Sequence, residues 1–148
     1  VLGCTPKHSF KEVALAPEAG ALLYVYRPYS PPVLRTPEIR ANGVRLGDLS
    51  QWRYMAVPLR PGRYTIDVDW SWDTLIADSK VDLRVEAGQK YYLRVVSGMT
   101  GVYAVGGIAG ATFSGSAAEI DREMALPELK KCGAQEDYQP HAVEVVPK

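Results

Sequence analysis

The sequence predicts a mostly-β protein, a single β-sandwich of roughly six to eight short strands with one helix near the C-terminus. Short apolar segments with the two-residue period of strands recur along the chain, and segments rich in glycine, proline or asparagine separate them. A helical period follows only after residue 116. The length of 148 residues fits one domain. We expect a tether at 1–21, the sandwich with its helix at 22–133 and a tail at 134–148.

Two segments show the strand pattern most clearly. From Arg63 to Trp70 and from Val81 to Val85, apolar and polar residues alternate, as in strands with one face in water. Further strands are expected at 22–27, 39–41, 54–59 and 90–96. Asn42-Gly43 predicts a tight hairpin turn, because both central residues of a type I′ turn need positive φ.

The segments between and after these strands are less regular. Ser116 and Glu119 have the spacing of a capping box, which predicts that the late helix begins there. Pro127 interrupts this helix or opens a second turn. The proline-rich stretch at 28–37 predicts a loop or irregular edge, and the glycine-rich stretch from Gly106 to Gly110 predicts close backbone packing or a flexible loop. The tail is expected to be loose or to add a short edge strand.

The charges exclude one class of partner. Seventeen basic residues balance seventeen acidic ones, and no block of like charge occurs, so we expect no nucleic-acid binding. No stretch of about 18 apolar residues occurs, which argues against a transmembrane helix.

The two cysteines allow two exclusive interpretations. Leu2-Gly3-Cys4 is similar to the end of a bacterial lipoprotein signal, in which the cysteine carries the lipid anchor. The alternative is a Cys4–Cys132 disulfide, which an oxidising envelope would favour. Two unrelated thiols are the third possibility.

A series of motifs carries a family resemblance. Its members follow one another from about Leu22 to Ile120: Tyr24-Val25-Tyr26-Arg27-Pro28, Asn42-Gly43, Pro61-Gly62-Arg63-Tyr64, Ala87-Gly88-Gln89 and Tyr91-Tyr92-Leu93-Arg94. The sequence resembles a family of small Gram-negative lipoproteins built around a domain of unknown function, and it is similar to PEGA-type β-sandwich domains. The resemblance implies a location in the cell envelope and carries over no catalytic residue.

Catalytic and metal sites find little support. His8 and His141 lie near opposite ends of the chain without an acidic partner in a recognisable pattern. Asp67, Asp69, Ser71, Asp73 and Asp78 have the spacing of a calcium loop, but Trp72 stands where that loop needs glycine. Gly106 to Gly110 lacks the ending of a phosphate-binding loop. We therefore expect no enzyme activity, no cofactor and no metal.

Aromatic residues are the remaining candidates for a site. Trp70 is expected in the core, whereas Trp72 with Tyr91 or Tyr92 could form an exposed binding surface. We expect a non-catalytic lipoprotein of the outer membrane facing the periplasm. Its partners would be the membrane, through the lipid anchor, and other envelope proteins. A glycan- or peptidoglycan-binding module that uses exposed Trp and Tyr side chains is the alternative.

Overall fold

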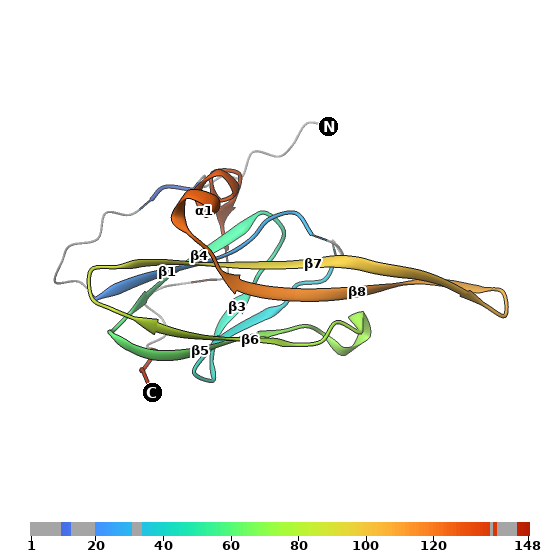
Figure 1. Ribbon diagram of the computed structural model, residues 1–148, viewed down its shortest axis with the longest axis horizontal. Coiled ribbons are helices and arrows are strands. Elements are labelled where there is room, and N and C mark those ends of the chain that lie inside the picture. Colours follow the sequence, from blue (N-terminus) through green and yellow to red (C-terminus); the bar gives the residue numbers. More distant parts are fainter. Residues whose placement is uncertain (1–9, 13–19, 31–33, 137, 139–144) are drawn as a thin grey trace.

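The computed structural model describes residues 10–12, 20–30, 34–136, 138 and 145–148, which form two packed sheets and one helix of more than one turn (Figure 1). Sheet A has the strand order β8-β7-β1-β4-β9 and sheet B the order β3-β2-β5-β6. The strands of sheet A are β1 (Ala21–Arg27), β4 (Arg53–Leu59), β7 (Lys90–Val105), β8 (Ile108–Glu119) and β9 (Gly133–Ala134). Those of sheet B are β2 (Glu38–Ala41), β3 (Val44–Asp48), β5 (Gly62–Asp69) and β6 (Ser79–Val85). The predicted mostly-β sandwich is confirmed.

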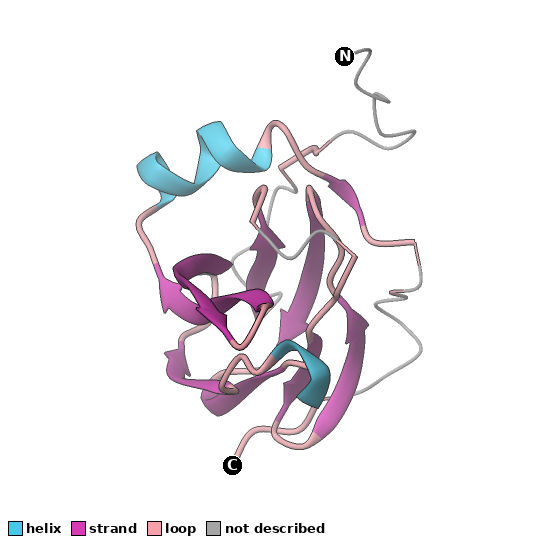
Figure 2. Cartoon of the chain, turned by 90° about the vertical axis from the view of Figure 1, so that its right-hand side faces the viewer, coloured by secondary structure: helices cyan, strands magenta, loops and turns pink. Residues whose placement is uncertain are grey.

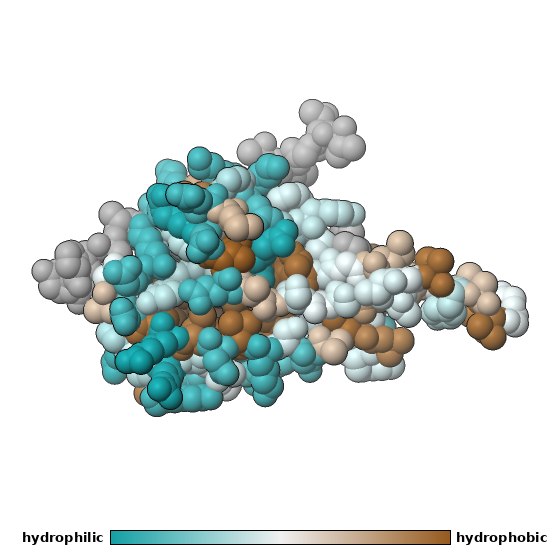
Figure 3. Space-filling model, in the orientation of Figure 1, coloured by the Kyte–Doolittle hydropathy of each residue, from teal (hydrophilic) through white to brown (hydrophobic). Residues whose placement is uncertain are grey.

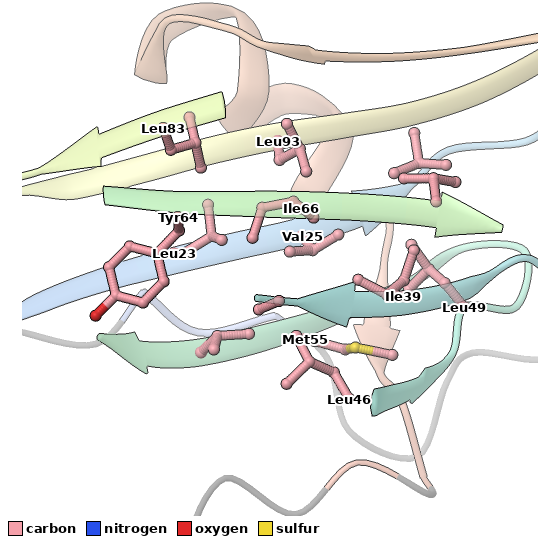
Figure 4. Close-up of a cluster of buried hydrophobic side chains, with 14 of the residues drawn as sticks. Leu23, Val25, Ile39, Leu46, Leu49, Met55, Tyr64, Ile66, Leu83 and Leu93 are labelled. Carbon is pink, nitrogen blue, oxygen red and sulfur yellow. The ribbon is translucent and has the colours of Figure 1, made fainter. Parts of the chain in front are cut away.

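The main core lies between the two sheets (Figure 4). β5 places Tyr64, Ile66 and Val68 in this core and turns its polar residues outward, as the alternation predicted. Leu23 and Val25 of β1 face them from sheet A. Burying each large apolar side chain contributes about 1.5–3 kcal/mol to stability.

A second core covers the opposite face of sheet A. Helix α1 (Arg122–Leu129) lies over this face and packs Ala125 and Leu129 on Tyr24, Tyr26 and Tyr92 (Figure 2). The ring of Phe10 meets Tyr24 and Tyr54 edge-on at centroid distances of 5.4 and 5.1 Å. All seven residues of β1 are therefore buried, which explains why this strand shows no polar alternation.

Arg27, at the end of β1, fixes the loops at one end of the sandwich. The side chain is fully buried, and its Nη1 donates to the backbone oxygens of Arg35 at 2.8 Å and Leu49 at 3.2 Å. Its Nε donates to Ser30 Oγ at 3.2 Å. The guanidinium also lies 5.0 Å from the centroid of the Trp70 ring, within the range of a cation–π interaction.

The glycine-rich segment is a hairpin rather than a loop. β7 and β8 pair from Leu93↔Glu119 to Val105↔Ile108, and Gly106-Gly107 turns the chain with φ of 60° and 81°. Asn42-Gly43 makes the predicted turn in the same way, with φ of 47° and 80°. The structure thus has nine strands within its described residues instead of six to eight, because residues 98–116 supply part of β7 and most of β8.

The predicted start of the helix is wrong. Ser116 and Glu119 belong to β8, and α1 begins at Arg122 after Asp121. The long pairing with β7 outweighs the local capping signal, because each added residue gains ladder hydrogen bonds and cross-strand contacts. Pro127 lies inside the helix. A two-residue edge strand, Gly133–Ala134, pairs with β4 at the boundary between the expected domain and the expected tail.

A glycine of β8 shows how closely the hairpin base packs. A Cβ at Gly115 would lie 2.8 Å from Ile76 Cγ2 and 2.9 Å from Trp70 Nε1, whereas one at Gly98 of β7 meets nothing within 4 Å. We predict that Gly115→Ala lowers the free energy of unfolding by about 1–3 kcal/mol through overpacking. Gly98→Ala is the matched control, and it should leave the free energy of unfolding unchanged or raise it slightly. Denaturant unfolding of both variants tests this prediction. If Gly115→Ala were as stable as Gly98→Ala, the described packing at Gly115 would be contradicted.

Candidate functional site

The most distinctive surface is the end of the β7–β8 hairpin, residues 99–112, which we call the projecting hairpin. It extends well beyond the body of the sandwich (Figure 1). Its exposed large apolar side chains are Met99, Val102, Tyr103, Val105 and Ile108. No charged residue occurs between Arg94 and Glu119. Figure 3 shows apolar atoms gathered at its tip, in contrast to the hydrophilic surface of much of the body on this side.

Both faces of the projecting hairpin are apolar, and one continues the core. Phe113 packs against the main core, so Ala111, two residues earlier in β8, lies on the same face of the sheet. Val102 is directly opposite Ala111 and shares that face, with its side chain 77% exposed. Tyr103 lies on the other face and covers Gly110 directly across from it. The core-facing surface of sheet A thus continues past the sandwich.

A second exposed apolar element lies at the base of the projecting hairpin. After β5, a short turn of 3-10 helix (Trp72–Thr74) leaves Trp72 88% and Leu75 82% exposed. The turn is held in place by an ion pair between Asp73 and Arg35 at 2.6 Å. It is also held by the backbone N–H of Trp70, which donates to Asp78 Oδ1 at 2.8 Å. Leu75 adopts a left-handed conformation with φ of 56°.

The other two predicted binding residues lie elsewhere. Tyr92 is only 3% exposed and packs in the second core beneath α1, which corrects its assignment to an exposed surface. Tyr91 is partly buried against the main core, and its hydroxyl accepts the backbone N–H of Glu86 at 2.9 Å. These neighbours point to opposite faces of sheet A, and each face is covered. Trp72 therefore has neither of them as a companion on the surface.

The acidic residues that have calcium-loop spacing are engaged separately. Asp67 Oδ1 lies 3.5 Å from Lys80, and Asp69 lies 3.6 Å from Arg40. Burial and the neighbouring carboxylates of Asp78 and Asp67 raise the pKa of Asp69. Across the described residues, no group of three or more His, Cys, Asp or Glu side chains is placed to hold a metal ion. His8 and His141 lie outside the described residues.

Cys132 is a buried free thiol beneath α1. Burial raises the pKa of this thiol to about 12, so it is protonated at neutral pH. Cys4, the predicted site of lipid attachment and the partner in the alternative disulfide, lies outside the described residues. No helix within the described ranges is long and apolar enough to cross a membrane.

Glu12 fastens the N-terminal segment to the body beside a surface hollow of about 620 Å³. Its Oε2 lies 2.8 Å from Nη2 of Arg122, and its Oε1 lies 3.3 Å from Nζ of Lys90. The Tyr92 hydroxyl donates to Oε1 at 3.1 Å. Chiefly the Arg122 guanidinium, with help from Lys90 and Tyr92, holds the pKa of Glu12 at about 2. With one carboxylate held by two cations and a hydroxyl, this cluster ties Glu12 to β7 and α1.

Comparison with known proteins identifies the family. A family described as "Protein of unknown function (DUF2846)" matches residues 17–108, more than half of the chain. The chain belongs to the DUF2846 family. In this DUF2846 protein the match includes β1 to β7 in full and reaches the turn of the projecting hairpin. No curated protein matches the chain, and no solved structure does.

Sequence reasoning missed the projecting hairpin and Glu12. The hairpin had a usable signal, because Gly106-Gly107 lies midway through the uncharged run and Gly-Gly is a common two-residue turn. Glu12 had none, since its partners Lys90 and Arg122 lie far along the chain.

Glu12 predicts a specific acid dependence of stability. Since its pKa is lowered from 4.5 to about 2 in the folded state, its contribution is complete above pH 4.5 and is lost as the pH falls towards 2. We predict that Glu12→Gln lowers the free energy of unfolding by about 1 kcal/mol at neutral pH, and that the difference from the wild type shrinks over this acid range. Glu123→Gln, on the exposed side of α1, is the control, and a pH-independent Glu12→Gln effect would contradict the assignment.

Proposed function

We propose that this DUF2846 protein is a lipid-anchored protein of the bacterial envelope that acts as a non-catalytic interaction module. In this proposal Cys4 carries the lipid and the domain faces the periplasm from the outer membrane. The resemblance of the motif series from Leu22 to Ile120 to small Gram-negative lipoproteins supports this location. No catalytic residue and no cofactor is assigned.

The observation that carries the interaction role is the projecting hairpin. Its five large apolar side chains are exposed together at one end of a domain whose other strands are covered or charged. Contiguous exposed apolar surface of this kind marks interaction sites in soluble domains, because leaving it in water costs about 25 cal/mol per Å². The absence of charge between Arg94 and Glu119 favours a partner bound by apolar contact and backbone hydrogen bonds over an ionic one.

The test combines intact-mass measurement with affinity capture. We predict that the mature native protein begins at Cys4 and carries acyl chains, and that Cys4→Ser releases it from the membrane. Captured envelope proteins should be lost about tenfold in a Val105→Ser, Ile108→Ser variant, since removing a central apolar contact costs about 1.4 kcal/mol or more. Met124→Ser removes an exposed apolar side chain from α1 and is the control. An unmodified Cys4 would overturn the proposed lipid anchor. Equal capture of envelope proteins by the wild type, the hairpin variant and Met124→Ser would overturn the interaction role.

The exposure of Trp72 favours a second function, binding of glycan or peptidoglycan. A single exposed indole can stack on a sugar ring, and Trp72 is the most exposed aromatic side chain of the described residues. If this role holds, Trp72→Ala should reduce co-sedimentation with purified peptidoglycan about tenfold, while Tyr29→Ala, exposed elsewhere, should not. No sedimentation of the wild-type protein would refute the glycan-binding role.

A further inference from the structure

The edges of the two sheets are protected to very different degrees. An exposed edge strand offers unpaired N–H and C=O groups to other chains, and proteins usually blunt it with charge, proline or shortness. Here β9 has two residues, β3 carries Arg45 and Asp48, and β6 carries three charged residues. β8, the outermost strand of sheet A, has twelve residues, and Glu119 at its last position is its only charge. β7 is also open on its outer side beyond Arg94, where its pairing with β1 ends, but a bulge between Met99 and Gly101 interrupts it. Within the described part of the chain, β8 is thus the one long edge that has neither interior charge nor a bulge.

The outer edge of β8 is equipped for pairing. No described strand pairs with β8 on the side away from β7. The backbone N–H of Ile120 donates to Tyr92 just beyond the end of β8, so the residues that bond to β7 are the even-numbered ones. The bulge between Met99 and Gly101 lies in β7, and β8 itself runs without interruption. The backbone groups of its odd-numbered residues therefore point outward.

We infer that β8 pairs antiparallel with β8 of a second copy of this chain, joining the two copies of sheet A into one sheet. The inference rests on the proposed function, since it names a partner for the projecting hairpin. Antiparallel pairing about a two-fold axis opposes one uncharged strand with another, so no like charges meet in its interior. It also uses the unprotected edge of both copies at once, so assembly closes at the dimer instead of growing.

The same pairing brings part of the exposed apolar surface against the second copy. Because the strands run antiparallel, the tip of each hairpin lies beside the base of the other. A two-fold axis perpendicular to the sheet keeps the core-facing sides together, so Ala111 of one copy approaches the end where Trp72 and Leu75 of the other are exposed. A protein surface with both a strand edge and apolar side chains therefore exists on the second copy.

A lipid bilayer suits the projecting hairpin less well. A hairpin of two strands keeps two open edges, and each backbone N–H or C=O without a partner costs several kcal/mol in hydrocarbon. Pairing with another β8 satisfies one of these edges, whereas lipid satisfies neither. The observations therefore favour a second copy over a membrane surface.

The experiment compares lysine substitutions at two directly opposed positions of the full chain. Ala111→Lys places a charge on the strand that pairs, and Val102→Lys places one on the same face of β7, one strand away from the pairing edge. Light scattering and sedimentation should give the wild type and Val102→Lys about twice the chain mass of 16.3 kDa, and Ala111→Lys the single mass. Amide hydrogen exchange in β8 of the wild type should slow as the protein concentration rises. This measurement does not require either variant to fold.

Each outcome decides the inference. A monomeric wild type with concentration-independent exchange in β8 overturns it. A dimer that both lysine substitutions disrupt equally also overturns it, because the copies would then pack through the core-facing side of the hairpin and not pair through the edge of β8. Flotation of the monomer with phosphatidylcholine vesicles would assign the projecting hairpin to lipid instead. A monomer that still captures other envelope proteins through the hairpin would overturn the self-pairing and leave the proposed function standing.

Discussion

The structure depends on the burial of β1 from both sides. Its odd-numbered side chains pack into the sandwich, and Tyr24 and Tyr26 pack beneath α1 with Phe10 beside them. Because a strand buried on two faces needs a cover on each, the helix and residues 10–12 belong to the fold and are not appendages. Glu12 and Arg27 add polar contacts at the margins of this arrangement, one fastening the segment and the other the loops.

The projecting hairpin is the exception to this coverage. At its base, Gly115 lets β8 pass closely over Trp70 and Ile76, so the hairpin is part of the rigid body there. Beyond Met99 nothing in the described structure lies opposite its core-facing side, and the same apolar alternation continues into solvent. A segment that extends the core pattern past the core gains stability only when another surface covers it. This is why we assign the interaction role to the projecting hairpin and not to the charged outer face of sheet B.

Candidate site residues could be predicted from the sequence only where they lie close together in the chain. The spacing of Asp67 to Asp73 was visible in the sequence, yet it reflects the outward face of a strand and a turn whose carboxylates have separate partners. Tyr91 and Tyr92 were equally prominent, but α1 covers Tyr92 and the main core covers part of Tyr91. Glu12 depends on partners from distant strands and a helix, which no local pattern encodes.

The sequence by itself determined most of the strands, the Asn42-Gly43 turn and the sandwich class, because alternation and turn signals act over a few residues. It also determined that the run between Arg94 and Glu119 carries no charge. Only the tertiary structure decided that this run is a hairpin and that the capping signal at Ser116 yields to pairing with β7. The reason is that strand pairing gains hydrogen bonds from residues remote in the chain, and these outweigh a local preference worth about 1 kcal/mol.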